Sequence, residues 1–185
     1  MKGVFRLRIV LDPGHGNFPG PGYDPGVIGP PPLRRHEAAA ALELALSCRM
    51  LLEQDGHDVY LTRNGQGISG KPDLAWRLRF AANLRADLFV SIHFNMIGGG
   101  GLVYHAPGAA SERFARGLAR RAGLSRVWPS SDSRFGGLYI DAFPDERPAV
   151  LWEVDGIERA PLPGVLGRGA RLRLAGALVQ AVKDL

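Results

Sequence analysis

The chain has a single cysteine, Cys48, among its 185 residues. One thiol excludes an internal disulfide, and it cannot by itself form a thiolate cage around a metal ion. Because Cys48 lies in an apolar stretch with helical spacing, we expect it in the hydrophobic core. Stability and any metal binding must therefore depend on packing and on ligands other than sulfur.

Long apolar runs are also absent. No segment approaches the roughly 20 apolar residues that a membrane-spanning helix needs. Near the N-terminus, Arg6 and Arg8 interrupt the chain before the apolar core of a signal peptide can form, and no small-residue cleavage site follows. We therefore expect neither a membrane span nor an export signal.

Lysine is scarce, with Lys2, Lys71 and Lys183 as its three occurrences, so arginine carries almost all of the net charge of +5. A basic surface favours anionic partners such as nucleic acids, acidic glycans or cell-wall polymers. No block of like charge is long enough for a nucleic-acid-binding tail, so we expect no nucleic-acid partner. The arginines on predicted helices, which we interpret as solvated faces, include Arg77, Arg79, Arg113, Arg116, Arg120 and Arg121.

Apolar strands alternate with amphipathic helices along the chain. The predicted strands are Leu7–Leu11, Asp58–Thr62, Leu88–Ile92, Leu102–His105 and Ala149–Val154. The predicted helices are Glu37–Gln54, Asp73–Leu84, Glu112–Ala122 and a last one from Leu162 or Val165 to Val182. This alternation, in a chain long enough to bury one core, predicts a single α/β domain over residues 1–185, with a mostly parallel twisted sheet flanked by helices on both faces.

Two segments lack this periodicity. Residues 17–33 are rich in glycine and proline, and residues 125–147 show no regular apolar spacing. Long irregular loops inside a compact domain are usually functional or disordered. Because both flank the candidate site residues, we interpret them as walls of a substrate cleft, with mobile surface loops as the alternative.

Chemically active side chains follow the predicted strands. His15 and His93 come after two of them, Glu37 begins the first helix, and Glu153 lies at the end of a late strand. Ligands of open α/β sheets gather outside the carboxyl ends of the strands, so these side chains are expected to converge. Two histidines and one carboxylate are the ligand set of a hydrolytic zinc site, and the remaining glutamate could then transfer a proton.

Each of these residues also has a purely structural interpretation. A histidine between glycines tolerates an unusual turn, a glutamate in the first turn of a helix complements its dipole, and His93 could be a core histidine. Glu153 could pair with an arginine, and Asp155 is its rival because strand alternation points both side chains to one face. His36, His57 and His105 do not share such positions, and we interpret them as surface or structural residues.

Other catalytic motifs fail on particular residues. Gly65–Lys71 satisfies two glycine-rich nucleotide patterns, but Pro72 stands where a P-loop needs serine or threonine. The pair His36-Glu37 is followed by Ala40, where a zincin helix needs its second histidine. There is no GxSxG elbow of a serine hydrolase. These absences favour the histidine–glutamate site.

The ordered motifs resemble those of the N-acetylmuramoyl-L-alanine amidase family known as amidase 3, or LytC-type amidases, over nearly the whole chain. The segment around His93 is the most specific of them. The motifs are Asp12–Gly16, Asp24–Gly29, Glu37 at a helix start, Leu61–Arg63, Ala86–Asn95 and Pro148–Glu153.

This resemblance implies a site and a reaction. His15, Glu37 and His93 would bind one Zn²⁺, Glu153 would be the catalytic glutamate, and Asn95 is predicted to contact the substrate. Arg77 falls where the family often has an arginine, with a structural role. The expected reaction is hydrolysis of the amide between the lactyl group of N-acetylmuramic acid and L-alanine in peptidoglycan.

The resemblance also suggests a biological setting. We expect a monomeric catalytic domain without a separate cell-wall-binding domain, acting as a lytic enzyme of the endolysin or autolysin type. It would reach the cell wall after release from the cytoplasm by holin-type lysis, or as a fragment of an exported enzyme. The alternatives are another zinc amidohydrolase or peptidase acting on the stem peptide, and a non-catalytic wall-binding module.

Overall fold

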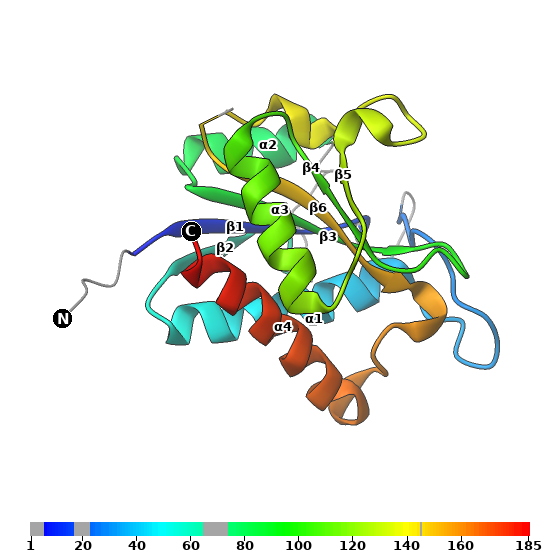
Figure 1. Ribbon diagram of the computed structural model, residues 1–185. Coiled ribbons are helices and arrows are strands. Elements are labelled where there is room, and N and C mark those ends of the chain that lie inside the picture. The colour runs from blue at the N-terminus through cyan, green and yellow to red at the C-terminus, as the bar shows by residue number, and fades with distance from the viewer. Residues whose placement is uncertain (1–5, 17–22, 65–73, 145) are drawn as a thin grey trace.

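The computed structural model describes residues 6–16, 23–64, 74–144 and 146–185 (Figure 1). Gly65–Lys71, with its glycine-rich patterns, lies outside these residues. The strands are β1 (Arg8–Pro13), β2 (Asp58–Leu61), β3 (Leu88–Asn95), β4 (Leu102–His105), β5 (Val127–Pro129) and β6 (Ala149–Gly156). The α-helices are α1 (Glu37–Gln54), α2 (Leu74–Asn83), α3 (Ala109–Ala122) and α4 (Arg168–Lys183).

In the described part of the chain, the strands form one six-stranded sheet in the order β2-β1-β3-β6-β4-β5. Strands β2, β1, β3 and β6 are parallel, whereas β4 runs antiparallel to β6 and parallel to β5. The carboxyl ends of β1, β3 and β6 therefore meet at one edge, where ligands of such sheets bind.

Helices cover both faces of the sheet (Figure 1). On one face, α1, α3 and α4 pack on alternate strand residues such as Leu11, Val90 and Trp152. On the other face, α2 and the segment around Ile140 pack on residues such as Phe89. The predicted α/β architecture, with a mostly parallel sheet between helices, is confirmed.

Helix α1 illustrates how local pattern and packing agree. The residues it buries against the sheet recur every three or four positions and include small alanines, which let the helix approach the strands closely. The chain turns at Gly56, whose φ of 95° suits a residue without a side chain. Cys48 is buried on this face, as its helical context predicts.

The main differences from the expected elements lie in the second half of the chain. Strand β5 falls in the segment where we predict no regular element, because three residues are too few to show alternation. The last helix begins at Arg168, after a short 3-10 turn over Gly164–Gly167. Within the described residues, no helix has the length and apolar character needed to cross a membrane.

Candidate functional site

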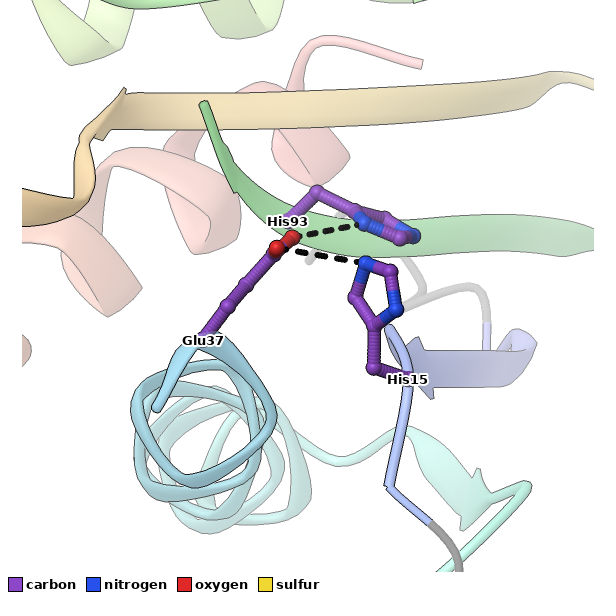
Figure 2. Close-up of side chains that lie close together, drawn as sticks. All are labelled: His15, Glu37 and His93. Carbon is purple, nitrogen blue, oxygen red and sulfur yellow. Dashed lines mark hydrogen bonds and ion pairs between the residues drawn. The ribbon is translucent and has the colours of Figure 1, made fainter. Parts of the chain in front are cut away.

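Three side chains from separate elements meet at the carboxyl edge of the sheet. His15 follows β1, Glu37 is the first residue of α1, and His93 lies near the end of β3. Figure 2 shows both imidazole rings turned towards the carboxylate of Glu37. His15 Nε2 lies 3.2 Å from Glu37 Oε2, and His93 Nδ1 lies 2.9 Å from Glu37 Oε1. The predicted convergence of these three residues is therefore observed.

The backbone and one carboxylate set the direction of His15. Its φ of 56° lies in the left-handed region, which residues other than glycine seldom adopt. Its Nδ1 contacts Asp24 Oδ2 at 2.8 Å, which leaves Nε2 on the side of Glu37. Burial disfavours the charged ring, but hydrogen bonds to Glu37 and Asp24 raise the pKa of His15 to about 9.

Glu37 is buried, and both of its oxygens accept backbone hydrogen bonds. Val27 donates its N–H to Oε2 at 2.9 Å, and Phe94 donates its N–H to Oε1 at 3.1 Å. Burial opposes the charge, but the hydrogen bonds to His15 and His93 hold the pKa of Glu37 well below its ordinary value. Glu37 is thus an oriented, ionised carboxylate.

Two glycines make room for these side chains. A Cβ added at Gly14 would lie 2.3 Å from Cε1 of His93, so the ring packs directly on that backbone. Gly26, with a φ of 64°, approaches Glu37 Oε2 and His15 so closely that a Cβ would lie 2.6 Å from the carboxylate oxygen. Glycine is therefore required at both positions for the triad to keep its shape.

The triad fits a divalent metal ion. His15, Glu37 and His93 each offer one ligand atom, and these three atoms all lie within 4.8 Å of one another. Within the described residues, they therefore form a group that could hold a metal ion. Imidazole nitrogen and carboxylate oxygen suit zinc, and three protein ligands leave a fourth position for water or substrate. The Asp24–His15 contact adds the carboxylate partner that metal-binding histidines commonly have.

Glu153 lies beside the triad. It pairs in register with His93 on the neighbouring strand, so the two side chains project from the same face of the sheet. Its Oε2 is buried and has no hydrogen-bond partner among the described residues. Burial raises the pKa of Glu153, an effect that His93 opposes and the nearby Glu37 increases. A carboxyl in this setting can exchange a proton closer to neutrality than an exposed glutamate.

The side chains of Asp155 and Asn95, the other two candidate residues, form hydrogen bonds with residues near them in the chain. Asp155 Oδ1 accepts hydrogen bonds from Arg159 Nε and from the Gly156 N–H, both at 2.8 Å. Asn95 Oδ1 accepts the N–H of Met96 at 2.8 Å, in the turn that follows β3. The predicted substrate contact of Asn95 stays a prediction.

A buried polar cluster beneath the site was not identified from the sequence. Asp12 is fully buried and accepts hydrogen bonds from Arg77, Thr62, Tyr139 and Ser91. The interpretation of Arg77 as part of a solvated face is wrong, because its side chain is buried against Asp12 and its guanidinium also donates to main-chain carbonyls. The other arginines of that group are exposed as expected.

Asp24 is the second residue that sequence reasoning missed. The available signal was its place in the Asp24–Gly29 motif, but nothing local indicates that it bonds a histidine nine residues earlier. The loop does lie against the triad, since Gly26 and Val27 contact it as well. The interpretation of residues 17–33 as a wall of a substrate cleft stays a prediction, to which the contacts of Gly26 and Val27 lend support in the described part of the segment.

The α/β domain, with two histidines and one glutamate together at the edge of its sheet, places this chain in the class of candidate metal-dependent hydrolases. The sequence profile of the N-acetylmuramoyl-L-alanine amidase family matches residues 9–141 of this chain. The chain belongs to that family.

Individual relatives agree with this assignment. The chain is 42% identical over 88 residues to N-acetylmuramoyl-L-alanine amidase AmiC of Escherichia coli O6:H1, a match covering 47% of this chain and 19% of AmiC. It is 36% identical over 97 residues to the sporulation-specific N-acetylmuramoyl-L-alanine amidase of Bacillus subtilis, covering 51% of this chain and 34% of the relative. The chain thus corresponds to only part of the length of these curated relatives.

A solved structure shares the fold over almost its full length. The catalytic domain of CwlV, an N-acetylmuramoyl-L-alanine amidase from Bacillus (Paenibacillus) polymyxa var. colistinus, superposes with a TM-score of 0.73 at 27% identity. The match covers 95% of this chain and 96% of the CwlV domain. The described sheet and helices are therefore those of an amidase catalytic domain.

Proposed function

We propose that this chain is a zinc-dependent amidase that hydrolyses the bond between the lactyl carbonyl of N-acetylmuramic acid and L-alanine in peptidoglycan. The observation that carries the proposal is the triad of His15, Glu37 and His93 beside Glu153, in a chain of the amidase family. Its net charge of +5 suits an anionic cell-wall polymer.

The protein ligands have distinct tasks in this proposal. His15 Nε2, one oxygen of Glu37 and one nitrogen of His93 would hold the ion, with Asp24 keeping His15 in the required tautomer. A bound zinc ion would polarise the lactyl carbonyl and lower the pKa of a water molecule to about 7.

Glu153 is the proposed catalytic acid and base. Its buried Oε2, which has no hydrogen-bond partner in the described part of the chain, lies next to the triad, and burial raises its pKa above the ordinary value of a glutamate. As a base, its carboxylate accepts a proton from the attacking water. As an acid, it then donates a proton to the departing nitrogen of L-alanine, which makes that nitrogen a neutral leaving group. Asp155 is a weaker candidate because Arg159 holds its carboxylate.

The test is digestion of purified peptidoglycan by the zinc-loaded protein, with and without a chelator. The proposal predicts new free L-alanine amino groups, no new reducing sugar ends, and loss of cleavage on chelation that added Zn²⁺ reverses. New termini elsewhere in the stem peptide would identify a peptidase instead. Binding to peptidoglycan without any cleavage would identify a wall-binding module.

A lytic role, which we also propose, predicts that the same protein clears suspensions of susceptible cells.

A further inference from the structure

Arg63 follows strand β2 and reaches under the site with its guanidinium. Nε donates to the carbonyl of Pro13 at 3.0 Å. Nη2 donates to the carbonyls of Gly14 at 2.8 Å and of Ala38 at 2.7 Å. Gly14 directly precedes His15, and Ala38 directly follows Glu37. One side chain therefore connects the loop that carries one triad member to the helix turn that carries another.

The fit between Arg63 and the loop is close. Gly16, which follows His15, has a φ of 64°, and a Cβ there would lie 2.6 Å from Cζ of Arg63. The guanidinium therefore supports the backbone on both sides of His15. Arg77 also donates to this loop, to the carbonyls of Pro13 and His15, each at 2.9 Å. Three successive carbonyls of this loop are thus held by two guanidinium groups.

The partners of Arg63 distinguish it from an ordinary structural arginine. It is half-buried, and among the described residues it forms no ion pair with a carboxylate. Asp12 and Asp24 act on the guanidinium electrostatically but do not bond it directly, and partly burying an arginine without a direct ion pair is unfavourable unless its N–H groups are well bonded. Here its bonds end on the segments of His15 and Glu37, so the distance between these two residues depends on them.

We infer that Arg63 is a positioning residue that sets the separation of His15 and Glu37, and thereby the metal affinity of the centre. The inference rests on the proposed metal site. It follows that loss of the guanidinium loosens the pre-formed geometry even where the fold persists. Groups that orient metal ligands typically contribute 10–100-fold to affinity, and we expect an effect of about that size.

The experiment measures the dissociation constant of Zn²⁺ alone, by competition with a chromogenic chelator, for the wild type and for Arg63→Gln. The matched control is Arg171→Gln. Arg171 is buried and likewise donates to two carbonyls, those of Leu162 and Gly164, and unlike Arg63 it also pairs with a carboxylate, that of Glu43. None of these three partners adjoins a triad residue in the chain. Circular dichroism and thermal unfolding show that each variant is folded and how much stability it has lost.

We expect Arg63→Gln to bind Zn²⁺ about 10–100-fold more weakly, and Arg171→Gln to lose thermal stability while binding Zn²⁺ as the wild type does. Wild-type affinity in folded Arg63→Gln would overturn the inference, and so would equal weakening in both variants. If Arg63→Gln does not fold, Arg63→Lys serves in its place, because one ammonium cannot reproduce the planar fork that reaches two segments. Unchanged affinity in Arg63→Lys would likewise overturn the inference. A wild-type protein that binds no Zn²⁺ would refute the proposed metal site itself.

Discussion

Replacing Arg77 by methionine tests the buried cluster beneath the site. Arg77 Nη1 lies 2.6 Å from Asp12 Oδ1, and the two side chains are 5% and 0% exposed. Methionine keeps much of the arginine's length but removes the charge. Asp12 would then remain buried without its cation, although the hydroxyls of Thr62, Tyr139 and Ser91 would still donate to it.

Removing one partner of a buried ion pair typically costs 3–5 kcal/mol, because the other charge is left uncompensated. The three remaining hydroxyl donors place our expectation at the lower end, about 3 kcal/mol. For a domain of this size, each kcal/mol lowers the melting temperature by about 2–4 °C, so Arg77→Met should melt roughly 6–12 °C below the wild type. The matched control is Arg116→Met, which removes an exposed pair with Glu112 and should change the midpoint little.

The same variant has a predictable pH dependence. Burial opposes ionisation of Asp12, but Arg77 and the hydroxyl donors hold its pKa below the ordinary value of 3.8. A carboxyl whose pKa is lowered on folding adds stability above its unfolded pKa, and this stability is lost as the pH falls through the folded value. Without Arg77, burial should instead raise the pKa of Asp12.

The difference in stability between wild type and Arg77→Met should therefore be large at neutral pH. It should begin to shrink as the pH falls through the raised Asp12 pKa of the variant, and go on shrinking until the pH passes below the lowered Asp12 pKa of the wild type. Urea unfolding monitored by circular dichroism at several pH values measures it. A difference below about 1 kcal/mol at pH 7, or one that stays constant down to pH 3, would refute the assignment of Asp12 and Arg77 as a buried ionised pair.

Three further substitutions probe the site directly. Glu153→Gln should retain stoichiometric zinc, measured by atomic absorption, but cleave peptidoglycan about 10²–10⁴-fold more slowly. The control Asp155→Asn should keep most of the activity, and an equal loss of activity in both variants would contradict the assignment of Glu153. Gly14→Ala should abolish tight Zn²⁺ binding, because the new Cβ occupies the space of the His93 ring. A Zn²⁺ affinity within twofold of wild type would show instead that the ring can shift freely. Asp24→Asn should weaken Zn²⁺ binding about tenfold in a chelator competition, since it removes the charged partner of a histidine ligand; no change would mean that the contact does not orient that ligand.

Local sequence patterns predicted most of the helices and strands. Glu37–Gln54 and Leu102–His105 are found with the bounds expected, because apolar spacing and the flanking glycines are local signals. The convergence of His15, Glu37 and His93 followed from the same reasoning, since carboxyl ends of parallel strands share one edge. That prediction needed only the order of the elements, without knowledge of side-chain contacts.

The remaining features depend on contacts between residues far apart in the chain. Helical position alone does not distinguish Arg77 from its neighbour Arg79, although the family resemblance implies a structural role for Arg77. The packing of α2 against the sheet buries Arg77 and leaves Arg79 exposed. The bond between Asp24 and His15 depends on how the irregular loop folds back over the sheet edge.

The sequence by itself determined the α/β class, the family motifs and the identity of the candidate ligands. Only the tertiary structure decided how those ligands are held, through the carbonyl contacts of Arg63 and the backbone donors of Glu37. The physical reason is that periodicity reports which face of an element is apolar, whereas a polar side chain acquires its partner, burial and pKa from surfaces that meet only on folding.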